Sequence, residues 1–155
     1  MEVISKVDDM KRRLYDYRTI NRDIENSIER LERLEAKMYC VSATTMSDMP
    51  KSPSPATDKF ADLIDRKEKL EATVKNLMRK RDVEREAIER LSDALKNPDE
   101  RAVINMRYLD CEEWDPIMEA LYGEKDDFDD EYENYKQKLF RRHRAAISHL
   151  ATLSQ

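Results

Sequence analysis

The chain has 155 residues, of which 41% are charged and 39% are hydrophobic, and its formal net charge is −5. Its one glycine, Gly123, excludes the glycine-rich loops that cradle phosphates or dinucleotides. β-Hairpin turns also depend on glycine, so an all-β fold is not expected. The negative charge argues against a surface that is basic throughout, but it allows local basic patches.

Membrane insertion and secretion are not expected. The longest apolar run, Met38–Val41, is far shorter than the roughly 20 residues that a membrane-spanning helix needs. The first residues carry no apolar signal core, which predicts a location in the cytoplasm. The two isolated cysteines, Cys40 and Cys111, fit that reducing compartment.

Two heptad patterns predict two long helices. Apolar residues alternate at spacings of three and four from Val3 to Met38, and again from Phe60 to Leu95. The stretch between these patterns contains three prolines and four serines, which interrupt a helix. We therefore expect helices at about 2–40 and 58–96, joined by a loop at 41–57.

The two helices are predicted to pair as an antiparallel hairpin. Facing residues then have numbers that add to roughly 98–105 if the loop is compact. This register places Glu35 beside Lys67 and matches apolar residues along the rest of the seam. The expected seam consists of Leu14, Tyr17, Asn21, Ile24, Ile28, Leu31, Leu70, Val74, Leu77, Arg81, Glu84 and Ile88.

The polar seam residues favour the hairpin over its alternative. In the antiparallel register, Tyr17 and Asn21 lie beside Arg81 and Glu84, so each has a complementary neighbour. The alternative is a parallel dimer in which each seam pairs with its own copy. Like charges such as Arg81 would then face each other, at a cost of several kcal/mol when buried.

Residues 97–155 predict three further helices. Asn97 is a suitable cap and Pro98 a suitable first residue for a helix that continues to about Tyr108. A short turn precedes a second helix, which ends at Gly123, a common residue at helix C-termini. The third starts within 128–132 and continues towards Leu150. Its expected inward face is Tyr132, Tyr135, Leu139, His143, Ala146, Ile147 and Leu150.

The third of these helices carries the strongest chemical signal. From Asn134 to the C-terminus there are five cations and no acidic residue. A helix with such a face can lie in the major groove of DNA, where arginine and lysine contact phosphates or guanine and amide side chains contact adenine. The alternative is a solvated basic face that complements the helix dipole. The candidate DNA-binding residues are Asn134, Lys136, Gln137, Lys138, Arg141, Arg142 and Arg144.

Two segments resemble a known DNA-binding module. Arg101–Leu109 and Trp114–Ile117, followed by the basic helix, resemble the helix-turn-helix that closes many sigma factors. Residues 124–133 depart from that module, which has only a short turn there. Seven acids and one lysine give them a charge of −6. They are interpreted as an exposed acidic helix start, or else as a shield for the basic face or a contact for RNA polymerase.

The whole chain resembles the RinA/ArpU-like phage regulators of low-GC Gram-positive bacteria. Beyond the C-terminal module, the resemblance rests on the heptad helix, on Ala43–Thr45 before the proline and serine loop, and on the second helix that starts near Asp58. It implies a sigma-like activator of late bacteriophage genes that binds double-stranded DNA through the C-terminal helices.

Catalytic and metal sites are not predicted. Asp127, Asp129 and Glu131 mimic the start of a calcium loop, but Tyr132 occupies the position that requires glycine. His143 and His149 are six residues apart and do not share a helical face. No serine, aspartate and histidine are ordered as a triad. The expectation is a protein that is not an enzyme and that has no cofactor.

The expected fold class is all-α, with a long antiparallel helical hairpin or coiled coil (1–96) and a small three-helix helix-turn-helix domain (97–155). The expected function is DNA-binding regulation of transcription by a homo-oligomer, a dimer or larger, that assembles through the hairpin. One alternative is a small terminase-like packaging protein. Another is an interaction protein without DNA contact that acts on a host factor such as RNA polymerase.

Overall fold

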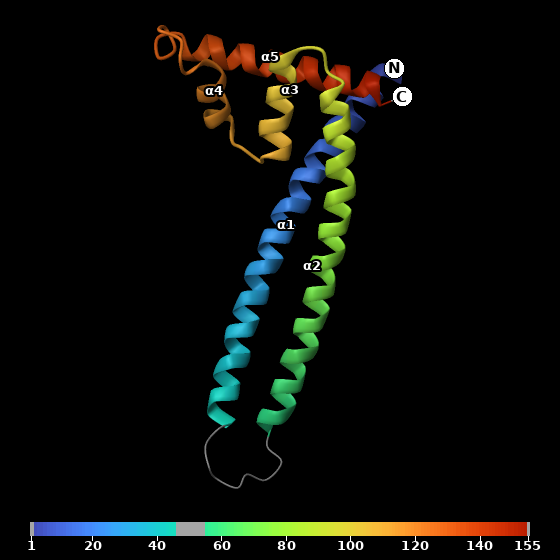
Figure 1. Ribbon diagram of the computed structural model, residues 1–155, viewed down its shortest axis with the longest axis vertical. Helices are drawn as coiled ribbons and strands as arrows, with labels where there is room; N and C mark the ends of the chain where they lie inside the picture. Colours follow the sequence, from blue (N-terminus) through green and yellow to red (C-terminus); the bar gives the residue numbers. More distant parts are fainter. Residues whose placement is uncertain (1, 46–54, 155) are drawn as a thin grey trace. The chain divides into compact units, whose positions relative to one another are not determined.

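The computed structural model describes the backbone of residues 2–45 and 55–154, with side chains for 4–43 and 58–154 (Figure 1). These residues contain helices and no strand, which confirms the all-α class. The elements are α1 (Glu2–Thr45), α2 (Pro55–Asp93), α3 (Pro98–Ile104), the π-helical turn η1 (Asn105–Leu109), α4 (Trp114–Tyr122) and α5 (Tyr132–Leu153).

The two long helices extend further into the expected loop than the sequence indicated. α1 continues through residues 41–45, which include neither proline nor glycine, so the helical hydrogen bonds are not interrupted. α2 starts at Pro55, a residue suited to the first turn of a helix. The remaining part of the expected loop, 46–54, lies outside the described residues.

The chain divides into two compact units. We call residues 20–81 the hairpin unit, and residues 1–19 together with 82–155 the C-terminal unit. The sequence suggested a boundary between residues 96 and 97. The start of α1 and the end of α2 instead belong to the same unit as the later helices, because their buried side chains share one apolar cluster.

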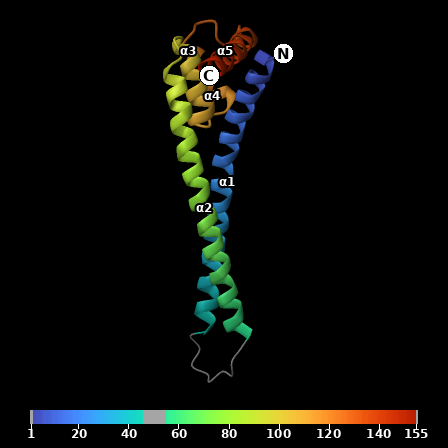
Figure 2. The ribbon, with the colours of Figure 1, turned by 90° about the vertical axis from the view of Figure 1, so that its right-hand side faces the viewer.

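In the hairpin unit, α1 and α2 lie side by side in opposite directions (Figures 1 and 2). Lys67 Nζ lies 3.3 Å from Glu35 Oε1, which confirms the predicted neighbours and gives a residue sum of 102. Ile24 and Val74 are buried in the seam. The half-buried apolar seam residues are Ile28, Leu31, Leu70 and Leu77. These residues of the expected seam thus pack within one chain.

Two apolar clusters hold the C-terminal unit together. The first joins Leu14 of α1 and Ile88 of α2 to Ile104 of α3 and Ile147 of α5, all of which are almost fully buried. Arg13 also forms an ion pair with Glu84 across α1 and α2. The second cluster joins α3, α4 and α5, and its buried members are Val103, Ile117, Met118, Tyr122 and Leu139.

The helix ends in the C-terminal unit agree with the sequence expectations. The Asn97 side chain accepts hydrogen bonds from the backbone N–H of Asp99 (2.9 Å) and of Glu100 (3.4 Å), and Pro98 starts α3. Gly123 follows α4 but keeps a right-handed backbone, with φ of −59°. A Cβ there would lie 2.4 Å from the Glu119 carbonyl oxygen, so close approach favours glycine.

Candidate nucleic-acid interface

α5 presents one apolar and one polar face. Its buried residues include Leu139, Ala146, Ile147 and Leu150, while His143 is half-buried. Tyr132 and Tyr135 are also half-buried, so the predicted inward face is confirmed. α3 and α4 both pack on α5 (Figure 1). The polar face of α5 therefore belongs to a helix that is packed on its other side, and not to a loop.

The candidate DNA-binding residues fall into two groups. Five are exposed and follow one another at helical spacing, and we call them the basic row. They are Asn134, Gln137, Lys138, Arg141 and Arg144. Lys136 and Arg142 are half-buried and lie beside this row. Arg142 lines a pocket of about 620 Å³ with Glu100 and His149, away from the row.

The cations of the basic row have few internal partners. Within the described residues, Lys138, Arg141 and Arg144 form no ion pair. Lys138 Nζ lies 5.5 Å from the centre of the Tyr122 ring, a weak cation–π contact. Exchanging water for a phosphate therefore breaks no salt bridge at these three side chains.

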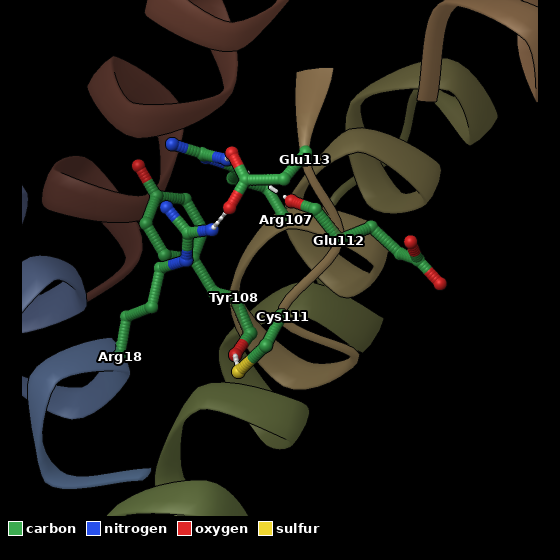
Figure 3. Close-up of polar contacts among 6 residues, drawn as sticks. All are labelled: Arg18, Arg107, Tyr108, Cys111, Glu112 and Glu113. Atoms are coloured by element: carbon green, nitrogen blue, oxygen red, sulfur yellow. Dashed lines mark hydrogen bonds and ion pairs between the residues drawn. The ribbon is translucent and has the colours of Figure 1, made fainter. Parts of the chain in front are cut away.

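The turn between η1 and α4 is held by two arginines (Figure 3). Arg107 donates a hydrogen bond of 3.0 Å to the Glu112 carbonyl oxygen, and its guanidinium lies 4.4 Å from the centre of the Trp114 ring. Glu113 accepts from Arg107 (3.3 Å) and from Arg18 of α1 (2.6 Å). The hydrogen bonds from Arg18 and then Arg107 lower the pKa of Glu113. Heptad analysis could not find Arg18, because it lies outside the seam.

Aromatic contacts join α4 to α5. The Trp114 ring packs edge-on against Phe140 (5.1 Å between centroids) and His143 (4.9 Å). Tyr108 Oη lies 2.7 Å from His143 Nε2. Burial lowers the pKa of His143 to about 4, with smaller contributions from nearby cations such as Arg107. His143 is thus a neutral packing residue near pH 7.

Residues 124–133, which we call the acidic segment, adjoin the start of the basic row. Asp127, Asp130 and Glu131 line a hollow of about 500 Å³ together with Lys138 and Arg141.

Two tyrosines hold this segment in place. Tyr135 donates a hydrogen bond to Asp127 (2.7 Å), and Tyr132 donates one to Asp115 (2.8 Å). These bonds raise the pKa of both phenols, since each stabilises the protonated form. The sequence did not show that the carboxylates and the basic row share one hollow.

The described residues contain no group of three His, Cys, Asp or Glu side chains arranged to hold a metal ion. None of their helices combines the length and the apolar character that crossing a membrane requires.

Comparison with known proteins identifies the family. Residues 53–150 match the model of a protein family of unknown function, DUF1492. No curated protein and no solved structure matches the chain. The matched range covers well over half of the sequence and includes α2, α3, η1, α4 and α5 as far as Leu150. The chain therefore belongs to the DUF1492 family.

Proposed function

We propose that this protein is a DNA-binding regulator of transcription that contacts double-stranded DNA through the basic row of α5. The observation that carries the proposal is the row itself: five exposed residues at helical spacing on a helix whose other face is packed. From Asn134 to Arg144 the row is about 15 Å long at 1.5 Å per residue. A major groove about 12 Å wide accepts a helix of this kind.

The acidic segment limits which part of the row meets DNA. Asp130 and Glu131 lie at the N-terminal end of α5, where they would repel phosphates. The DNA contact is therefore assigned mainly to Lys138, Arg141 and Arg144. Gln137 is next to them and has the amide group that pairs with adenine.

Self-association is part of the proposal. One recognition helix provides few contacts, and regulators of this type commonly bind repeated half-sites as dimers. In the hairpin unit, Ile64 is 36% exposed, and Ile20 and Met78 are half-buried beside the seam. These side chains would widen the apolar face available to a second hairpin. The resemblance to phage regulators makes late phage promoters the first DNA to test.

The test measures fluorescence anisotropy of DNA fragments tiled across the genomic neighbourhood of the gene. The wild type is compared with a row variant, Lys138→Gln/Arg141→Gln/Arg144→Gln, which removes the three charges and keeps helix propensity. A matched control, Lys75→Gln/Arg79→Gln/Lys80→Gln, removes the same charge from exposed positions of α2.

The expected result is saturable binding of the wild type and control to one fragment at physiological salt, and its loss in the row variant. Three phosphates neutralised by Lys138, Arg141 and Arg144 predict that these residues contribute about −2.7 to the slope of log K against log salt. If the row variant binds as the control does, α5 is not the DNA contact. A ring-sized oligomer on a fragment beside terminase genes would indicate the packaging protein instead. No DNA binding, with capture of RNA polymerase, would indicate the interaction protein.

A further inference from the structure

A second basic surface consists of residues of the hairpin unit, none of which belongs to α5. Between α1 and α2 there is an open groove of about 490 Å³. Among the described residues, five cations line it and no acidic residue does. These cations are Arg30, Arg33, Lys37, Arg66 and Lys69. We call this surface the hairpin groove.

The cations form two facing rows. On α1 they have spacings of three and four residues, so Arg30 and Lys37 are about 10 Å apart along the helix. On α2, Arg66 and Lys69 share a face with Thr73, again at spacings of three and four. Leu34 and the seam residue Leu70 also line the groove. The groove therefore combines apolar side chains with cations from both helices.

The heptad pattern does not explain this arrangement. A helix with exposed charges usually alternates their sign around its surface. Here the three ion pairs formed by the groove's cations use acids outside the lining, at distances of 3.1 Å (Arg33 to Glu29), 3.0 Å (Arg66 to Asp62) and 2.9 Å (Lys69 to Asp65).

Those ion pairs do not prevent the cations from binding another anion. Each of the three cations is at least 67% exposed. Exposed pairs of this spacing add little stability and are readily exchanged for another anion. Arg30 and Lys37 form no ion pair within the described residues. The groove is therefore able to bind a ligand with several negative charges in a row.

We propose that the hairpin groove is a second nucleic-acid contact, which binds the phosphate backbone of duplex DNA without reading its sequence. Each DNA strand has one phosphate about every 3.4 Å along the helix axis, so a 10 Å row of cations spans about three phosphates. The arginine guanidinium is suited to paired phosphate oxygens. The proposal rests on the proposed function only for its choice of DNA as the polyanion.

The test uses the full chain and a DNA fragment without a specific site. The groove variant is Arg30→Gln/Arg33→Gln/Lys37→Gln, and the control is again Lys75→Gln/Arg79→Gln/Lys80→Gln. Removing three phosphate contacts is expected to weaken binding at least tenfold at low salt and to reduce the salt slope by about 2.7. Arg66→Gln/Lys69→Gln, on the opposite wall, is expected to reduce the slope by about 1.8. Circular dichroism checks that each variant remains helical.

The outcomes separate this proposal from the function proposed for α5. If the groove variants bind like the control, the groove is not a DNA contact, whatever the α5 row variant does. If only the groove variants lose binding, the groove proposal holds and the α5 proposal fails.

A protein ligand for the groove is tested by sedimentation without DNA. The acidic segment of a second copy is the competing ligand, because it also carries several negative charges. An oligomer that dissociates in high salt and in the groove variants, with DNA binding unchanged, would assign the groove to a second copy and overturn the proposal.

Discussion

The phenol of Tyr108 and the imidazole of His143 form a hydrogen bond of 2.7 Å that joins η1 to α5. Their rings are also stacked, with centroids 5.8 Å apart. The pKa of His143 falls to about 4, mainly because burial disfavours the charged ring. Nε2 accepts from the Tyr108 hydroxyl in one tautomer and donates to the phenol oxygen in the other, so it is the burial of the ring, rather than this bond, that favours the uncharged histidine.

This histidine predicts how stability depends on pH. The unfolded chain has an ordinary histidine pKa near 6.5, so between pH 6.5 and 4 it binds more protons than the folded chain. The contribution of His143 is complete above pH 6.5 and is lost as the pH falls, by about 1.4 kcal/mol per pH unit and about 3 kcal/mol in total. Urea unfolding at several pH values measures the free energy of unfolding.

The variant His143→Gln isolates this effect, since its amide can form a hydrogen bond with the Tyr108 hydroxyl in either direction but does not titrate. The difference in the free energy of unfolding between the wild type and the variant is expected to show the whole loss between pH 6.5 and 4. If the free energy of unfolding changed equally with pH in the two proteins, His143 would not be protonated on unfolding in this range.

The ion pair of Glu35 and Lys67 predicts a small coupling energy. Their side chains are 49% and 31% exposed, so a double-mutant cycle should give about 0.2–1 kcal/mol. Charge reversal of Glu35 to Lys should destabilise the chain, and Lys67→Glu should restore part of the loss. Recovery is incomplete because Lys67 also lies 3.7 Å from Glu71. In the control, Glu32→Lys with Lys67→Glu should show no coupling. Equal coupling in both cycles would contradict the register.

Arg107 is expected to be sensitive even to a conservative change. Lysine keeps the charge but loses the planar contact with Trp114 and the geometry that reaches the Glu112 carbonyl oxygen. Arg107→Lys should therefore lower the free energy of unfolding by about 1–2 kcal/mol. Trp114 is the chain's one tryptophan, so its fluorescence reports the change directly. Arg12→Lys, at a position 74% exposed, should change neither stability nor fluorescence.

Removing negative charges from the hollow beside the basic row should increase the affinity for DNA. Asp130→Asn/Glu131→Gln removes two charges close to Lys138 and Arg141. At about 8 Å in water each charge opposes a phosphate by about 0.5 kcal/mol, so affinity at low salt should rise about two- to fivefold. The control Glu124→Gln/Asp126→Asn removes the same charge outside the hollow and should have a smaller effect. An unchanged affinity would show that DNA does not approach this end of α5.

The local structure of this protein follows from its sequence because the governing interactions are local. Heptad spacing determined that α1 and α2 form and which faces they bury, and the opposite charges of Glu35 and Lys67 indicated the register in which they pair. Asn97 and Pro98 marked the start of α3 for the same reason, since a cap bonds only to its own first turn. The inward face of α5 was likewise readable from helical periodicity.

Only the tertiary structure decided which distant residues share a surface. Arg18 donates a hydrogen bond to Glu113, which lies 95 positions later in the sequence, and no periodic pattern in a sequence relates residues that far apart. The hairpin groove depends on two rows that approach from opposite helices, so each row alone resembles an ordinary solvated face. The pKa of His143 depends on how fully neighbouring helices exclude water from it. The packing of the helices determines how deeply His143 is buried, and that burial determines whether its imidazole is charged.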